Sequence, residues 1–257
     1  MKTKINDLNV NYIKEGEGKE NVLILEGWGT NIETYRVLID SLKTYSTVYC
    51  FDMPGFGKTD EPKKSYTLEE YVDLTIKFVE SQGIKELSLI GHSNGGKVII
   101  KMMAEKDLPF KVNKIVLIGS AGIVHEKTAK QKRKIKMFKL GKKFLSLKVV
   151  KFFFPNALEN LKKKSGSADY RSATPVMRET LVRLVNTDVR DCLPKIKAPT
   201  ILIYGEYDTA TPAADGELMS KMIPDAGFIK VNGATHYVFL EYPVYVNNII
   251  KTFFTNK

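Results

Sequence analysis

Short, nearly continuous runs of apolar residues recur along the chain, and each ends in glycine or aspartate. They are VLILEG (22–27), TVYCFD (47–52), LSLIG (87–91), KIVLIG (114–119) and TILIYG (200–205). A strand covered on both faces reads as a continuous apolar run, whereas a half-exposed strand alternates. These runs therefore predict buried strands of one sheet, and FIKV (228–231) predicts the last of them.

Helical patterns lie between these runs. In TLEEYVDLTIKFVESQG (67–83), Thr67 is the expected N-cap, Glu70 follows three residues later and Gly83 is the expected C-cap. Another helix is expected over 94–105. Strands that alternate with helices form right-handed βαβ units. The fold class is therefore α/β, with a mostly parallel central sheet and helices on both faces.

The segment 121–197 interrupts this alternation. It has no comparable strand run, and it carries 20 Lys/Arg against 6 Asp/Glu, a net charge of +14 in a chain whose total is +11. We interpret it as a helical cap inserted over the carboxyl edge of the sheet. The expected division is a core in two parts, 1–120 and 198–257, with the cap between them.

One strand end carries a serine between glycines. GHSNG (91–95) has the spacing G-x-S-x-G, follows a strand and precedes a helix. Such a sharp turn strains the serine backbone, and side chains at the flanking positions would collide with the neighbouring strand or helix. The turn lifts the Ser93 hydroxyl above the sheet and points the backbone N–H of Asn94 toward whatever the serine attacks. The strand and helix around it disfavour a turn with an incidental serine.

A serine nucleophile needs a base to take its proton. The chain has three histidines. His92 adjoins the serine, and its side chain is expected on the far side of the turn, while His125 opens the cap. His236 follows the last predicted strand and is the expected base.

The base in turn needs an acid to orient it, here between serine and histidine in the sequence. The stretch YGEYDTATP (204–212) supplies candidates just past a predicted strand. We favour Asp208, with Glu206 and Asp215 as the rival acids.

Four segments together resemble the α/β-hydrolase fold family, over essentially the whole chain outside the cap. Besides the serine turn, FDMPGFGKTD (51–60) resembles the family's D-x-P-G-x-G loop, and APTILIYGEYDTATP (198–212) and GATHYVFLEYP (233–243) resemble its acid and histidine segments. The resemblance implies Ser93 as nucleophile, Asp208 as orienting acid and His236 as base. It also implies that the loop EGWGT (26–30) supplies the second oxyanion donor, the backbone N–H of Trp28, beside that of Asn94.

Glu26 departs from the family pattern, in which histidine commonly begins this loop. Its carboxylate would oppose a developing oxyanion unless it is hydrogen-bonded away from it. Either Glu26 only ties down the loop backbone, or it binds a cationic or hydroxylated group of the substrate.

A serine at this turn indicates acyl transfer to water, with no metal or organic cofactor required. We expect a serine hydrolase of a small or medium acyl substrate, most simply a carboxylic ester. Cleavage of a carbon–carbon bond in a dienoate, or thioester hydrolysis, is the alternative. A ligand-binding protein without catalysis is an alternative of another class.

The surroundings of the chain are also constrained by its sequence. No apolar leader or membrane-spanning run is found, and Cys50 and Cys192 are far apart, so a cytoplasmic protein with reduced thiols is expected. The stretch 127–164 carries 14 of the cap's 20 basic residues, interleaved with aliphatic and aromatic ones. That pattern suits an anionic membrane surface, but it also suits a cap helix with its apolar face over the active site. Nucleic acid is not expected, since no binding motif accompanies the charge.

Overall fold

The computed structural model describes residues 1–105, 107–164 and 166–255, except for the side chains at positions 131, 148, 149, 151, 159 and 162–164. In this part of the chain, eight strands form one sheet in the order β1-β2-β4-β3-β5-β6-β7-β8. The strands are β1 (Lys2–Ile5), β2 (Leu8–Glu15), β3 (Glu20–Leu25), β4 (Ser46–Phe51), β5 (Glu86–His92), β6 (Lys111–Ile118), β7 (Thr200–Gly205) and β8 (Ala226–Val231). β2 pairs antiparallel with β1 and β4, and the other neighbours are parallel.

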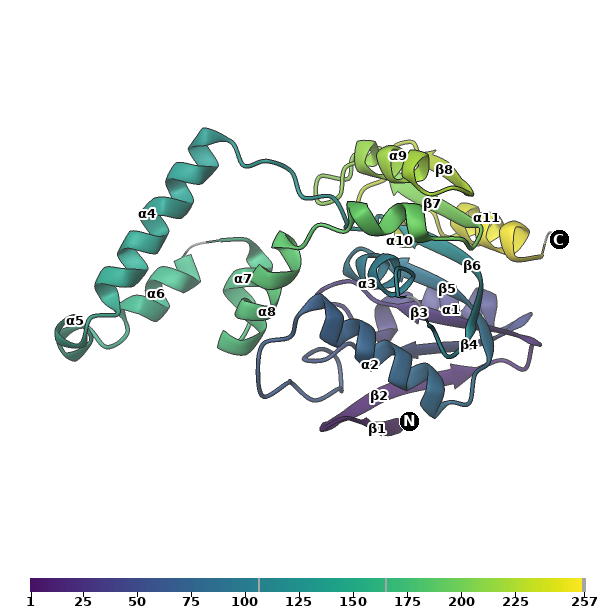
Figure 1. Cartoon of the computed structure of the whole chain (residues 1–257), viewed down its shortest axis with the longest axis horizontal. Helices are drawn as coiled ribbons and strands as arrows, with labels where there is room; N and C mark the ends of the chain where they lie inside the picture. The colour runs from purple at the N-terminus through teal and green to yellow at the C-terminus, as the bar shows by residue number, and fades with distance from the viewer. Residues whose placement is uncertain (106, 165, 256–257) are drawn as a thin grey trace.

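Helices cover both faces of the sheet (Figure 1). They are α1 (Arg36–Leu42), α2 (Leu68–Ser81), α3 (Asn94–Met102), α9 (Ala213–Met222), α10 (Val238–Glu241) and α11 (Pro243–Thr255). Leu23 of β3 belongs to the core cluster that contains Leu74 of α2, whereas its neighbour Ile24 belongs to the cluster with Leu38 of α1 and Ile250 of α11. Successive strand residues thus enter opposite cores, which explains the continuous apolar runs. The predicted fold class is confirmed.

Two helices bear on the predicted caps and bounds. Thr67 and Glu70 form a capping box at the start of α2, as predicted, and the helix stops just before Gly83, which has a φ of +67°. Helix α3 ends at Met102 instead of the expected residue 105, and the backbone continues as a turn. The β1–β2 hairpin at the N-terminus was not predicted from the sequence.

The segment between β6 and β7 holds α4 (Ala129–Leu145), α5 (Lys148–Phe153), α6 (Ala157–Lys164), α7 (Ala168–Ser172) and α8 (Pro175–Asn186). Helix α8 is fixed to the core, because the buried ammonium of Lys97 donates to the carbonyls of Leu184 and Thr187, and the N–H of Tyr66 donates to Thr180 Oγ1. In contrast, α4, α5 and α6 extend away from the sheet, with α5 at the far end (Figure 1). The division into core and cap stays a prediction.

None of the helices in the described ranges is both long enough and apolar enough to cross a bilayer.

Candidate active site

The turn between β5 and α3 holds Ser93 in a strained backbone conformation, with φ 51° and ψ −113°. Residues other than glycine rarely adopt a positive φ, and they keep it only where surrounding contacts enforce it. Here the Ser93 N–H donates to the carbonyl of Ile118 at 3.0 Å, and the Ser93 carbonyl accepts from Ala121 N–H at 3.0 Å. The end of β6 therefore holds the turn from both sides.

Two glycines of the G-x-S-x-G stretch are explained by close packing. A Cβ atom at Gly91 would lie 2.6 Å from the Cα of Gly96, and one at Gly95 would collide with the backbone oxygen of Leu25. β3, β5 and α3 thus approach one another more closely than any side chain allows. The glycines are a requirement of the turn that presents Ser93.

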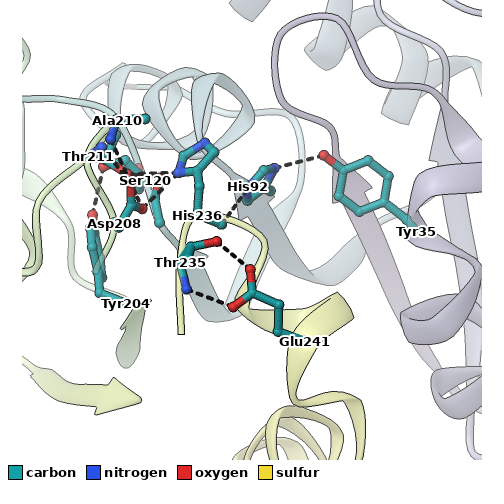
Figure 2. Close-up of polar contacts among 11 residues, drawn as sticks. Tyr35, His92, Ser120, Tyr204, Asp208, Ala210, Thr211, Thr235, His236 and Glu241 are labelled. Atoms are coloured by element: carbon teal, nitrogen blue, oxygen red, sulfur yellow. Dashed lines mark hydrogen bonds and ion pairs between the residues drawn. The ribbon is translucent and has the colours of Figure 1, made fainter. Parts of the chain in front are cut away.

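Asp208 follows β7 and His236 follows β8, and the two side chains lie together, as Figure 2 shows. His236 Nδ1 is 2.7 Å from Asp208 Oδ2. Asp208 is buried, and its Oδ1 accepts from the N–H groups of Ala210 (2.8 Å) and Thr211 (2.9 Å). Burial raises the pKa of Asp208, but the hydrogen bonds from His236 and Thr211 outweigh it and hold the pKa below its ordinary value. The group beside His236 is therefore a carboxylate.

Thr211 is a site residue that the sequence analysis missed. Its hydroxyl lies 2.8 Å from both Asp208 Oδ2 and the carbonyl of Gly119, and 3.2 Å from His236 Nδ1. A hydroxyl has one proton to donate, so it serves one of these acceptors at a time. No motif in the sequence marks Thr211, and its place in the site follows from these contacts alone.

The rival acids lie elsewhere. Glu206 Oε2 accepts from the N–H of Gly233 at 3.0 Å, and Asp215 on α9 bonds the ring of His125 at 2.8 Å. Of the three acids weighed, Asp208 is the one that the structure brings to His236.

Ser93 lies at the same edge of the sheet as this pair. A Cβ atom at Gly119, next to Ile118 in β6, would be 3.3 Å from both Asp208 Oδ2 and His236 Nδ1. The Ser93 side chain is half-buried, and its hydroxyl makes no hydrogen bond within the described part of the chain. In unliganded enzymes the serine–histidine contact is often long and tightens when substrate binds.

The loop after β3 runs beside Ser93. A Cβ atom at Gly27 would lie 3.3 Å from Ser93 Cβ. The backbone N–H groups of Trp28 and Asn94 donate to no described residue, and their role as oxyanion donors stays a prediction. The Trp28 ring packs edge-on against Phe56, with ring centroids 4.8 Å apart, which fixes the loop against the D-x-P-G-x-G segment.

Glu26 begins this loop and is fully buried. Its Oε1 accepts from the N–H of Met53 at 2.5 Å, and its Oε2 has no partner among the described residues. Burial raises the pKa of Glu26 well above its usual range, and the nearby Asp52 carboxylate raises it further. Burial therefore favours the neutral form of this carboxyl group, and the neutral form would add no charge that opposes an oxyanion. These contacts favour the interpretation that Glu26 ties down the loop, and they give no support to a direct contact with substrate.

A buried chain of hydrogen bonds links this loop to the histidine loop (Figure 2). Gly27 N–H donates to the Tyr35 hydroxyl at 2.7 Å, which lies 2.9 Å from His92 Nδ1, and His92 Nε2 lies 3.1 Å from the carbonyl of His236. A carbonyl only accepts, so the proton of His92 sits on Nε2, and Nδ1 accepts from Tyr35. Burial, and then the neighbouring His236, lower the pKa of His92 to about 3, so it stays neutral. His92 and Tyr35 are thus positioning residues; His92 was assigned no such role from the sequence, and Tyr35 was not predicted at all.

Tyr35→Phe is expected to lower kcat for an ester by about tenfold with little change in KM, and to cost about 1–3 kcal/mol of stability, because it leaves Gly27 N–H and His92 Nδ1 without buried partners. Tyr71→Phe is the matched control, since Tyr71 is equally buried and its hydroxyl makes no hydrogen bond to a described residue. Steady-state kinetics and thermal unfolding measure both. Equal kcat values for the two variants would show that the chain of hydrogen bonds does not position the site.

In the part of the chain that the structure describes, no cluster of three or more His, Cys, Asp or Glu side chains is placed to hold a metal ion.

Known proteins are similar to this chain over its whole length or over part of it. A profile of the alpha/beta hydrolase fold family matches residues 20–243. The pimeloyl-[acyl-carrier protein] methyl ester esterase of Wigglesworthia glossinidia brevipalpis is 28% identical over 257 residues, which are 93% of this chain and 95% of that protein. The dihydrolipoyllysine-residue acetyltransferase component of the acetoin cleaving system of Cupriavidus necator is 28% identical over 118 residues, which are 46% of this chain and 31% of that protein.

Among solved structures, a bromoperoxidase from Bacillus anthracis has a TM-score of 0.78 and 20% sequence identity, over 100% of this chain and 99% of that one. At this identity the likeness concerns the fold. The sequence profile covers the serine turn and both loops that carry Asp208 and His236. The chain belongs to the alpha/beta hydrolase fold family.

Proposed function

We propose that this protein is a serine hydrolase that cleaves a carboxylic ester of a small or medium acyl group. The observation that carries the proposal is the 2.7 Å contact between His236 Nδ1 and a buried Asp208 carboxylate, at the sheet edge where a strained turn presents Ser93. These are the three groups that acyl transfer requires: a nucleophile, a base and an acid that orients the base.

Acylation follows from the protonation state of His236. The Asp208 carboxylate accepts the proton on Nδ1, so the lone pair is on Nε2. Nε2 takes the Ser93 proton as Oγ attacks the ester carbonyl, and the tetrahedral oxyanion is held by the N–H groups of Trp28 and Asn94. When the intermediate collapses, His236 returns the proton to the departing alcohol and an acyl-Ser93 ester remains.

Deacylation repeats these steps with water. His236 takes a proton from water, the hydroxide adds to the acyl carbonyl, and the same two N–H groups hold the second oxyanion. The carboxylic acid leaves as Ser93 recovers its proton from His236. The chemistry balances without metal or cofactor.

The names of relatives support an ester over the other acyl substrates. The Wigglesworthia relative, similar along 93% of this chain, is named for a methyl ester on a carrier-bound acyl group. A methyl ester has a small alcohol leaving group, and hydrolysis of it needs no more than the steps above. Hydrolysis of a thioester and cleavage of a carbon–carbon bond in a dienoate are the competing reactions, and a comparison of substrates distinguishes them from ester hydrolysis.

Labelling with a fluorophosphonate probe tests the proposal, because the probe reacts with a serine only when a base activates it. The purified protein should be labelled at Ser93, as mapped by mass spectrometry, and heat denaturation should abolish labelling. Methyl and p-nitrophenyl esters of increasing acyl length should be hydrolysed faster than a matched thioester or a ring-opened dienoate. An unlabelled, folded protein would point to ligand binding without catalysis, and faster cleavage of the thioester or dienoate would overturn the ester assignment.

A further inference from the structure

The helices α4–α6 form a projecting unit, which we call the arm (residues 129–164) (Figure 1). One side of α4 packs within the molecule. The Phe138 ring contacts Tyr170 of α7, with ring centroids 6.4 Å apart, and a Cβ atom at Gly141 would lie 3.3 Å from Leu161 of α6. These contacts use one face of α4 and leave the other faces in solvent.

Other apolar residues of α4 form a stripe on a solvent-exposed face of the helix. Met137, Leu140 and Phe144 are spaced three and four residues apart, as positions on one helical face are, and each is more than half exposed. Phe152, Phe153 and Phe154 follow at the far end of the arm and are 64–81% exposed. Soluble monomeric proteins rarely expose so many large apolar side chains close together, and such patches mark interaction sites.

A stripe of lysines runs beside these apolar residues. Lys132, Lys136, Lys139 and Lys143 are spaced four, three and four residues apart and line a groove of about 490 Å³ together with Ile135 and Leu140. None of the four lysines forms an ion pair or side-chain hydrogen bond with a described residue. The whole arm carries 13 Lys/Arg and a single acidic residue. Its surface is therefore both cationic and apolar.

We propose that the arm binds the surface of an anionic lipid bilayer. Lipid phosphates would accept from the lysines, while the phenylalanines at the end of the arm and the outer stripe of α4 would enter the boundary between headgroups and acyl chains. The position of the arm suits this, since α5 projects farthest from the sheet and meets a flat surface before the core does (Figure 1). A nucleic-acid strand would use the lysines but leave Met137 and Leu140 in water. This inference does not depend on the proposed hydrolase activity.

The other interpretation of this segment is a cap helix with its apolar face buried over the active site. That interpretation predicts that Met137, Leu140 and Phe144 are covered. The structure shows them exposed.

Sedimentation with vesicles tests the proposal, using the full chain and phosphatidylcholine vesicles with or without about 30% phosphatidylglycerol. At about 0.1 M salt, partitioning to the anionic vesicles should be at least about tenfold stronger, and about 0.5 M salt should weaken it. Changing Lys132, Lys136, Lys139 and Lys143 together to Gln should lower it at least about tenfold, since each lysine near such a surface contributes about fivefold before screening. Changing Phe152, Phe153 and Phe154 together to Ser should lower it by a similar factor.

Matched controls separate the arm from net charge and general hydrophobicity. Lys19, Lys85, Lys111 and Lys197 are exposed at the amino ends of β3, β5, β6 and β7, the sheet edge opposite Ser93, and changing them to Gln removes the same charge. Val244 and Tyr245 are exposed apolar residues on α11, and changing them to Ser removes apolar surface away from the arm. Both controls should bind vesicles within about threefold of the unchanged protein.

Three outcomes would overturn the proposal. They are equal, negligible binding to both kinds of vesicle at low salt, equal loss in the arm and control lysine variants, and full binding by the phenylalanine variant. The last result would indicate a purely electrostatic surface, of the kind that an acidic protein recognises.

Discussion

Ser93→Ala is expected to abolish ester hydrolysis, with kcat lowered by about 10⁴- to 10⁶-fold and the fold intact. The substitution removes the oxygen that attacks the carbonyl, while the oxyanion donors and the His236–Asp208 pair stay in place. The remaining activity is what those donors give to the direct attack of water. Initial rates with a p-nitrophenyl ester measure the loss, and the variant should also lose fluorophosphonate labelling. Activity within tenfold of the unchanged protein would assign the nucleophile to another residue.

Ser93→Gly separates chemistry from strain at the same position. Both variants lack the hydroxyl, but alanine keeps a Cβ atom at φ 51° and ψ −113°, where an L-residue is strained and glycine is not. The free energy of unfolding of Ser93→Gly should therefore exceed that of Ser93→Ala by about 1 kcal/mol, and its unfolding temperature should be higher. Both variants should be inactive. A glycine variant less stable than the alanine variant would show that the strain at this position is smaller than the extra conformational entropy that glycine loses on folding.

The sheet was predictable because its central strands are covered on both faces. Leu23 and Ile24 enter different cores, so β3 has no polar side to interrupt its run, and the same holds for the strands beside it. The N-terminal hairpin escaped prediction for the opposite reason. β1 is the edge strand and β2 lies next to it. The β2 sequence LNVNYIKE mixes buried, half-exposed and exposed positions, so no continuous apolar run marks the hairpin.

The only residues of the candidate site that could be predicted are those whose position follows from the order of the strands along the chain. Ser93, Asp208 and His236 each follow a strand that ends at one edge of the sheet, so the order of strands brings them together. Tyr35 comes from the helical turn after the Trp28 loop and meets His92 across 57 positions of sequence. No local pattern records a contact of that kind, since it arises when α1 packs on the sheet.

The segment 121–197 shows where the sequence pattern alone leaves two interpretations open. An α4 stripe of lysines beside apolar residues fits a helix buried over a site as well as a helix on a membrane. The direction in which the arm leaves the core decides which apolar residues are exposed, and that direction depends on how the chain continues from β6 and returns through α8.

Asp208→Asn is expected to lower kcat by about 10⁴-fold while KM and the fold change little. The contacts of Asp208 give the reason. Its Oδ1 accepts from two backbone N–H groups, those of Ala210 and Thr211, so the amide oxygen of an asparagine would remain there. The NH₂ group would then occupy the position of Oδ2 and donate to His236 Nδ1. His236 would carry its proton on Nε2 and would have no lone pair to take the proton of Ser93.

Glu206→Gln is the matched control for this change, because it makes the same carboxylate-to-amide substitution two residues earlier in the same loop. Glu206 bonds Gly233 N–H through one oxygen, and a glutamine oxygen can accept that bond equally well. Its kcat should stay within about twofold of the unchanged protein, since the substitution leaves the His236 tautomer alone. Steady-state kinetics on both variants, with circular dichroism to show that each is folded, make the comparison. A crippled Glu206→Gln beside a mild Asp208→Asn would reverse the assignment of the acid, and equal small effects would mean that His236 works without an orienting carboxylate.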